Sequence, residues 1–126
     1  LVQAVRLKSV IPLWKYEAGE SVTTTPTVAG GRVFFGTVNG KLVAVEAASG
    51  RLAWEFPVPG GIHSDPAVHE GLVFFGSDSG VFYALDAASG RERWRFESGR
   101  EIMSSPLVDG GVVYFGGCDG KVYAFR

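Results

Sequence analysis

The two histidines of the chain, His63 and His69, are its best candidates for metal chemistry, and Asp65 stands between them. Imidazole nitrogens and carboxylate oxygens bind zinc, but such a site needs three or more groups that converge on the ion. His63 precedes a predicted strand, His69 lies in the turn after it, and neither recurs in the repeat described below. We interpret both histidines as loop residues and predict no metal site.

A nucleophile activated by a neighbouring base is the second kind of catalytic site for which we searched the sequence. The single cysteine, Cys118, lies in a predicted turn, and neither histidine accompanies a recognisable nucleophile signature. We therefore interpret Cys118 as an incidental thiol and predict no catalytic residue.

Segments 36–42 and 116–122 contain glycine and lysine and look at first like phosphate loops. Their spacing is Gly-x3-Gly-Lys instead of Gly-x4-Gly-Lys, no serine or threonine follows the lysine, and each joins two predicted strands. The turns at 77–80 and 118–120 lack the regular carboxylates of a calcium loop. No phosphate, calcium or cofactor site is predicted.

The composition favours strands and tight turns over helices. The 126 residues are 46% hydrophobic and include 18 glycines but only six prolines and one methionine. A net charge of −1 gives no electrostatic basis for binding nucleic acid or an anionic membrane, and no apolar run is long enough to span a bilayer. The single cysteine excludes an internal disulfide. These numbers predict one β-rich domain or a piece of a larger one.

A period of forty residues organises the sequence. The sets that keep this step are Trp14, Trp54 and Trp94; Pro26, Pro66 and Pro106; Gly36, Gly76 and Gly116; Gly40, Gly80 and Gly120; and Ala44, Ala84 and Ala124. Self-similarity at one fixed spacing is the signature of a repeat architecture, in which each repeat is one supersecondary unit.

Each repeat is predicted to hold four antiparallel strands, because short runs rich in Val, Phe and Tyr alternate with glycine-containing turns. In the first complete repeat these strands are 24–29, 32–37, 41–46 and 52–57. The predicted units are 24–58, 64–98, 104–126 without its outer strand, and a partial unit of third and fourth strands at 1–19.

Glycines at the predicted turns indicate their backbone geometry. Asn39–Gly40 predicts a two-residue type I′ turn with positive φ at both positions, and Asp119–Gly120 matches it. Gly50 and Gly90 are predicted to adopt the left-handed conformation that closes the hairpin between the third and fourth strands, and we count both among the residues that dock neighbouring blades.

A twisted four-stranded sheet of about forty residues is one blade of a β-propeller. The predicted fold class is therefore all-β, a β-propeller of four-stranded antiparallel blades with about three blades per chain. In the fourth strand, Trp14, Trp54 and Trp94 are expected to face the neighbouring blade, where small side chains at Ala44, Ala84 and Ala124 leave room. An indole buried in this way removes roughly 200 Å² from water and contributes several kcal/mol.

The segments 44–54 (AVEAASGRLAW) and 84–94 (ALDAASGRERW) carry a resemblance to a known family. They resemble the tryptophan-docking motif of the pyrroloquinoline quinone (PQQ)-like repeat, Ala-x-Asp-x-x-Thr-Gly-Lys-x-x-Trp, with Ser for Thr, Arg for Lys and Glu46 for Asp in one copy. The resemblance covers about residues 11–126. It implies docking roles for Trp54 and Trp94 and, by position, for Trp14.

The same resemblance bears on activity. Dehydrogenases of the family hold PQQ and Ca²⁺ on the propeller axis with carboxylate and amide ligands, often beneath a vicinal Cys-Cys ring, whereas this chain has one cysteine and one asparagine. The resemblance therefore implies a non-catalytic scaffold for protein interaction or assembly, with a periplasmic or extracytoplasmic location by family habit. The alternatives are a fragment of a PQQ-dependent quinoprotein dehydrogenase, or a designed or amplified repeat with no native ligand.

Three blades are too few to surround an axis, since propellers have four to eight. Two explanations stay open: the chain is an excerpt of a larger ring, or copies join in trans. In the second, segment 13–18 of one copy docks on the apolar edge strand 121–126 of the next. We predict a homo-oligomer, most simply a dimer with six blades.

Small polar residues begin the first strand of each unit and are expected to point into the axial channel or its mouth. They are Thr24, Thr25, Ser64, Asp65, Ser104 and Ser105. Because propellers bind partners at such ends, this surface is the predicted place for an interaction.

Overall fold

The computed structural model describes residues 1–5 and 12–126, and over these residues the chain is built from β-strands in four antiparallel sheets. The N-terminal hairpin contains β1 (Val2–Val5) and β2 (Pro12–Tyr16). The first blade contains β3 (Thr27–Ala29), β4 (Arg32–Gly36), β5 (Lys41–Glu46) and β6 (Leu52–Pro57). The second blade contains β7 (Ala67–His69), β8 (Leu72–Gly76), β9 (Val81–Asp86) and β10 (Glu92–Glu97). The third blade contains β11 (Leu107–Asp109), β12 (Val112–Gly116) and β13 (Val122–Phe125).

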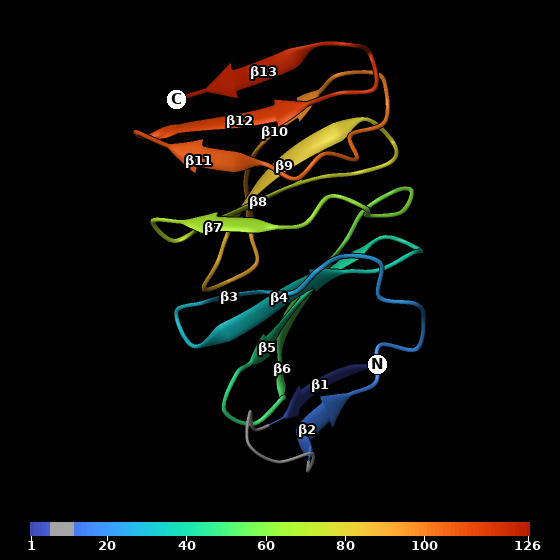
Figure 1. The fold of residues 1–126 in the computed structure, drawn as a ribbon, viewed down its shortest axis with the longest axis vertical. Coiled ribbons are helices and arrows are strands. Elements are labelled where there is room, and N and C mark those ends of the chain that lie inside the picture. The colour runs from blue at the N-terminus through green and yellow to red at the C-terminus, as the bar shows by residue number, and fades with distance from the viewer. Residues whose placement is uncertain (6–11) are drawn as a thin grey trace.

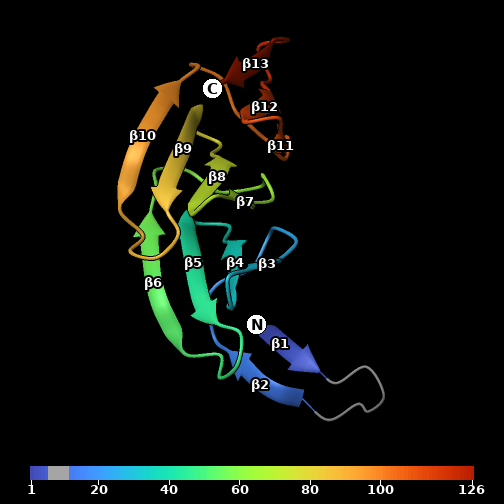
Figure 2. The same ribbon diagram turned by 90° about the vertical axis from the view of Figure 1, so that its left-hand side faces the viewer.

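The sheets follow one another along an open arc with the two termini at opposite ends (Figure 1). The outer strands β6 and β10 lie along one side of the arc, and the inner strands β3 and β7 lie along the other (Figure 2). Successive inner strands contact each other, β3 with β7 and β7 with β11. The predicted fold class is confirmed: the sheets are blades of a β-propeller, and residues 1–5 and 12–126 form an open part of the ring. No helix in the described part of the chain is long and apolar enough to cross a membrane.

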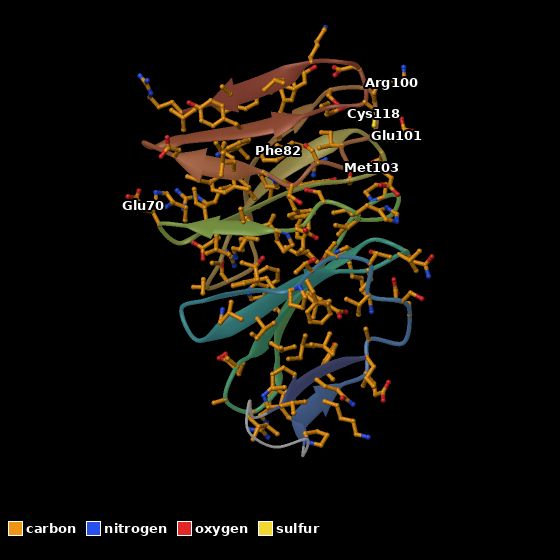
Figure 3. The ribbon with its side chains drawn as sticks, viewed as in Figure 1. Glu70, Phe82, Arg100, Glu101, Met103 and Cys118 are labelled. Carbon is orange, nitrogen blue, oxygen red and sulfur yellow. The ribbon has the colours of Figure 1, made fainter. Side chains whose placement is uncertain are left out.

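Apolar side chains fill the spaces between successive sheets. One core combines Phe34, Leu42, Ala44 and Trp54 of the first blade with Val73, Phe75, Tyr83 and Leu85 of the second. In the next space, the ring of Phe82, which is labelled in Figure 3, stacks on that of Phe115. The ring centroids lie 3.8 Å apart. The third strands of the first two blades, β5 and β9, are buried on both faces, whereas the outer strand β10 alternates, as expected from stacked blades.

The first strand of each unit is shorter than predicted. β3 begins at Thr27 instead of Thr24, because Pro26 has no N–H group to donate to a ladder. The chain before the proline still contacts the blade, since Thr23 N–H donates to Gly36 O at 3.1 Å.

The turn predictions at Asn39–Gly40 and at Asp119–Gly120 are wrong, because neither Asn39 nor Asp119 has a positive φ. Gly40 has a φ of 95°, but Glu70 is the only non-glycine residue with positive φ in the described ranges. Gly40 N–H donates to Thr37 O at 3.2 Å and Thr37 N–H donates to Lys41 O at 3.1 Å, which defines a three-residue loop with a glycine bulge.

Two-residue turns with positive φ at both positions occur instead between the first and second strands of each blade. They are Gly30–Gly31, Glu70–Gly71 and Gly110–Gly111.

Candidate functional site

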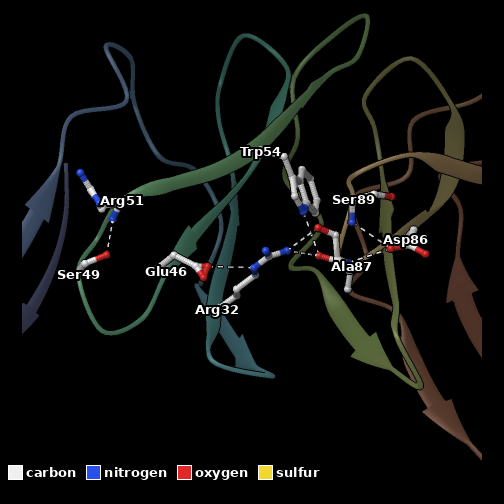
Figure 4. Close-up of polar contacts among 9 residues, drawn as sticks. Arg32, Glu46, Ser49, Arg51, Trp54, Asp86, Ala87 and Ser89 are labelled. Atoms are coloured by element: carbon white, nitrogen blue, oxygen red, sulfur yellow. Dashed lines mark hydrogen bonds and ion pairs between the residues drawn. The ribbon is translucent and has the colours of Figure 1, made fainter.

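The indole of Trp54 joins the first blade to the second. It lies on β6 with Ala44 as its cross-strand partner, and its Nε1–H donates to Ala87 O of the second blade at 2.9 Å (Figure 4). The ring rests on Gly90, where an added Cβ would lie 2.5 Å from Cδ2 of the indole. Only a glycine at position 90 permits this contact.

Trp14 makes the same contacts one sheet earlier. Its Nε1–H donates to Ala47 O at 2.8 Å, and a Cβ at Gly50 would lie 2.5 Å from its ring. Its cross-strand partner is Ala4. Each of these two indoles therefore bonds to a carbonyl 33 residues further along the chain, in the next sheet.

Trp94 occupies the equivalent place on the second blade. It pairs with Ala84, and its ring lies 5.6 Å from that of Phe125 on the third blade. Ala124 lies on β13, which pairs with β12 and has no other strand beside it among the described residues.

The turn beneath each indole is held by local bonds. Gly50 and Gly90 have φ values of 73° and 75°, so their predicted left-handed conformation is confirmed. Asp86 Oδ1 accepts the N–H groups of Ala88 at 2.9 Å and Ser89 at 3.0 Å. The N–H of Ser89, and then that of Ala88, hold the pKa of the Asp86 carboxyl below its usual value.

Glu46 stands at the position of Asp86 but acts differently. Its carboxylate pairs with Arg32 at 3.1 Å, and the Arg32 guanidinium also donates to Ala87 O and Ala88 O at 2.8 and 2.7 Å (Figure 4). The longer side chain of Glu46 thus positions Arg32, which joins the first and second blades in addition to the bond of Trp54. An open cleft of about 750 Å³ lies beside this bridge, and its polar lining includes Arg32, Glu46 and Asp86.

A chain of hydrogen bonds with the repeat spacing runs along the inner edge of the blades. Thr25 N–H donates to Asp65 Oδ1 at 2.7 Å, and Asp65 N–H donates to Ser105 Oγ at 3.2 Å. The Thr27 hydroxyl adds a bond to Pro66 O at 2.5 Å. These bonds hold neighbouring blades together at the edge nearest the axis.

Thr24 and Ser64 do not line the channel, contrary to the sequence-based expectation. Thr24 is 8% exposed and its hydroxyl accepts the N–H of Gly36 at 2.9 Å, so it caps the end of β4. Ser104 makes the equivalent bond to Gly116 at 2.8 Å but stays exposed. Ser64 is buried, and its Oγ has no hydrogen-bond partner in the part of the chain that the structure describes.

The histidines and the cysteine lie apart from one another. His63 Nδ1 pairs with Asp78 at 2.9 Å, and His69 lies beside Glu70. Cys118 is exposed at the end of the blades opposite Glu70 (Figure 3). Within residues 1–5 and 12–126, no three histidine, cysteine or acidic side chains are close enough together to hold a metal ion.

Sequence reasoning missed two parts of this arrangement. It placed Gly50 and Gly90 among the docking residues but explained them by turn geometry alone, and it did not identify either glycine as the surface on which an indole rests. It also missed the Arg32 bridge. The constant offset of 36 residues from Trp14 to Gly50 and from Trp54 to Gly90 was a signal for the glycine contacts. The Arg32 bridge had no such signal, because Arg32 has no counterpart in the other repeats.

Comparison with known proteins gives one family and several similar structures. The family model described as outer membrane protein assembly factor BamB matches residues 2–126. BamB from Moraxella catarrhalis is 27% identical with a TM-score of 0.80, covering 90% of this chain and 36% of that one. The quinohemoprotein alcohol dehydrogenase ADHIIG from Pseudomonas putida HK5 is 25% identical with a TM-score of 0.72, covering 89% of this chain and 20% of that one. A comparison with curated proteins gives no match.

A third solved structure, the quinohemoprotein alcohol dehydrogenase from Comamonas testosteroni, shares the fold at 23% identity and a TM-score of 0.72. It matches 84% of this chain and 19% of its own length. The chain therefore spans little more than a third of the BamB structure and about a fifth of each dehydrogenase.

Proposed function

The chain belongs to the family described as outer membrane protein assembly factor BamB, and from this premise we propose that it is a non-catalytic propeller segment that acts as a scaffold for protein interaction. Similar structures include BamB and two alcohol dehydrogenases. The choice between scaffold and enzyme therefore rests on what the inner edge of this chain does. The family description supports an extracytoplasmic location, and we propose the periplasm.

The hydrogen bond between Thr25 N–H and Asp65 Oδ1 is the observation that carries the proposal. Asp65 is the one ionisable residue among the six at the starts of the inner strands, and a dehydrogenase would need carboxylate ligands on this axis. Here the Asp65 carboxylate accepts a backbone N–H of the first blade, and its own N–H donates to the third. This edge holds blades in place and presents the exposed hydroxyls of Thr25, Ser104 and Ser105 to a partner.

The simplest partner is a second copy of the chain. Residues 13–18 and 121–126 belong to the two ends of the arc (Figure 1), and β13 offers an open strand edge. Unpaired edges pair readily with other chains. We propose a homodimer through these two segments. Measuring the mass in solution by analytical ultracentrifugation at micromolar concentration tests it, and a stable folded monomer across that range contradicts it.

The enzyme alternative keeps its own test, because two of the similar structures are dehydrogenases. We expect no change in the absorbance of PQQ and no dye reduction when PQQ and Ca²⁺ are added to the folded protein. A saturable spectral change that is lost in Asp65→Asn would overturn the scaffold proposal and favour a quinoprotein.

A further inference from the structure

We propose that the cleft between the first and second blades binds an extended basic segment of a partner protein. In this arrangement a lysine or arginine side chain of the segment lies along the apolar wall of the cleft, and its cationic group lies beside Glu70 and Asp86. This inference rests on the proposed scaffold function and names the class of partner that the chain binds.

Both walls of the cleft belong to complete four-stranded blades. One wall contains the turn between β3 and β4 and the end of β5, and the other contains the turn between β7 and β8 and the turn after β9. Within each blade the two turns are joined, by Ala47 N–H to Gly31 O at 2.9 Å and by Ala87 N–H to Gly71 O at 2.8 Å. The cleft has a volume of about 750 Å³ and is open to solvent. That volume lies within the range of binding sites, and the open shape suits an extended segment of chain.

The lining of the cleft combines an apolar wall with charged side chains. Phe34, from the core between the two blades, lies in the apolar wall together with the half-buried Ala29, Val68 and Ala87. Lysine and arginine have an apolar stem and a cationic end, so either one complements both parts of the lining. The ionisable lining residues are one guanidinium, three carboxylates and one imidazole, with a formal charge of −2 when the imidazole is neutral: Arg32, Glu46, His69, Glu70 and Asp86.

Two of the three carboxylates keep oxygens that can accept a hydrogen bond from a cation. The side chain of Glu70 is 84% exposed, and its Oε1 lies 3.6 Å from His69 Nε2. Asp86 uses Oδ1 for the two N–H groups of its own turn, and its Oδ2 lies 3.8 Å from Arg93 Nη1, beyond hydrogen-bond distance. Glu46 is different, because its carboxylate is paired with Arg32.

Arg32 gives the cleft a hydrogen-bond donor. Its Nε donates to Glu46 and its Nη1 donates to Ala87 O and Ala88 O, whereas Nη2 has no hydrogen bond to any residue that the structure describes (Figure 4). A guanidinium carries five N–H groups in a fixed plane, so Nη2 keeps donors for a main-chain carbonyl of the bound segment. Bonds to the main chain hold an extended peptide, and the carboxylates then select its basic side chain.

The backbone at Glu70 supports a role in binding. Glu70 has a φ of 48°, and the equivalent positions hold Gly30 and Gly110 with φ values of 58° and 57°. A left-handed glutamate is less favourable than a glycine, and the exposed side chain of Glu70 does not offset this cost by packing. Strained conformations of this kind concentrate at functional sites. Glu70 therefore serves the bound segment, since the turn itself is better made by glycine.

Nuclear magnetic resonance of the full chain of 126 residues tests the site directly. The titrant is a capped peptide in which lysine and valine alternate, and the matched control peptide has glutamine in place of lysine. We expect the lysine peptide to shift the amide resonances of Gly71, Ala87 and Ala88 in a saturable way that weakens at high salt. The glutamine peptide is expected to cause no such shifts. Shifts confined to other parts of the chain, or equal binding of the two peptides, would overturn the proposal.

Substitution of Glu70 separates binding from folding. Glu70→Gly places the residue of both equivalent turns, so its unfolding temperature is expected to stay the same or rise. Its Kd for the lysine peptide is expected to rise about two- to fivefold, the effect of losing one exposed ion pair. Glu70→Lys keeps a side chain at the same φ and reverses the charge, so its Kd is expected to rise by about tenfold or more.

The matched control for both variants is Glu101→Gln. It removes one carboxylate at the end of the blades opposite Glu70 (Figure 3) and is expected to leave the Kd for the lysine peptide unchanged. An unchanged Kd in both Glu70 variants, or an equal rise in Glu101→Gln, would contradict binding in the cleft.

Arg32→Leu distinguishes a binding site from an acidic surface. The variant copies Leu72 at the equivalent position and removes a positive charge. A surface that only attracts cations would then bind the lysine peptide more tightly, whereas loss of a charged donor to the peptide is expected to raise the Kd about tenfold. Circular dichroism checks folding, and the Glu70 variants keep the test decisive if this variant unfolds. Tighter or equal binding in a folded Arg32→Leu would overturn the proposal.

The outcomes separate this inference from the proposed function. A chain that forms the proposed homodimer but does not bind the lysine peptide keeps its scaffold function, and the cleft proposal fails. A saturable spectral change with PQQ and Ca²⁺ that is lost in Asp65→Asn removes the scaffold function, whatever the result with the peptide.

Discussion

At the residue scale, Gly90 satisfies two separate demands. Its φ of 75° is unfavourable for a residue with a Cβ, and the same Cβ would meet the indole of Trp54 at 2.5 Å. Gly71 shares only the first demand, since its φ is 78° and nothing lies within 4 Å of its added Cβ. Substitutions at these two glycines therefore distinguish the free-energy cost of the left-handed conformation from the cost of a clash with the indole.

We expect Gly71→Ala to lower the free energy of unfolding by about 1–2 kcal/mol, the cost of a left-handed alanine. Gly90→Ala is expected to cost about 1–3 kcal/mol more, because the methyl group overfills the contact with the indole. Urea denaturation followed by tryptophan fluorescence measures both. Equal losses in the two variants would show that Trp54 moves aside at no cost.

Asp86 predicts a pH dependence at the same turn. Its pKa is lowered in the folded state by the N–H groups of Ser89 and Ala88. The stability it adds is therefore fully present above its unfolded pKa of about 3.9 and is lost as pH falls through the lower folded value. Between about pH 5 and pH 2, the free energy of unfolding is expected to fall more steeply in wild type than in Asp86→Asn. Parallel curves would contradict this role.

At the element scale, the segments that link blades cross the ends of the second strands. Ile62 and Ile102 are buried, and a Cβ added at Gly36 or Gly76 would lie 2.5 or 2.2 Å from the Cγ2 of the isoleucine above it. At the third equivalent position, Gly116, the nearest atom is Ser104 Oγ at 3.6 Å. The segments that link the blades therefore require a glycine at positions 36 and 76, in the first two blades, but not at position 116 in the third.

Gly76→Ala is expected to destabilise the protein by about 1–3 kcal/mol through overpacking against Ile102. Gly116→Ala, at the same place in the third blade, is expected to be nearly neutral. Thermal unfolding of the two variants side by side checks the difference. A similar loss in both would mean that a fourth strand or a link already covers Gly116 in solution.

The middle and outer strands were predictable from sequence because their signals are local. Apolar runs and a constant period place β4, β5 and β6 within a residue of their observed bounds. The loop at Asn39 was not predictable from its dipeptide, since the bonds of Thr37 select a three-residue loop. The side chain of Thr24 is buried because its hydroxyl accepts the N–H of Gly36, twelve residues away. The sequence pattern does not reveal this contact.

At the scale of the whole molecule, each sheet contacts only its neighbours, so stability is expected to decline from the middle of the arc to its ends. β9 is buried at four successive positions, whereas β13 has no fully buried residue. In a monomer, hydrogen exchange followed by mass spectrometry is expected to show the slowest exchange in β4, β5, β8 and β9 and faster exchange in β13.

The side-chain bonds between sheets have a direction. Trp14, Trp54 and Arg32 each donate to a carbonyl of a later sheet, so the leading and trailing ends of the arc carry different chemistry. Such a stack has polarity, and two like ends cannot reproduce its bonds. In the proposed homodimer, a copy with only its trailing end disabled would therefore pair with a wild-type copy at one junction and leave the other junction open.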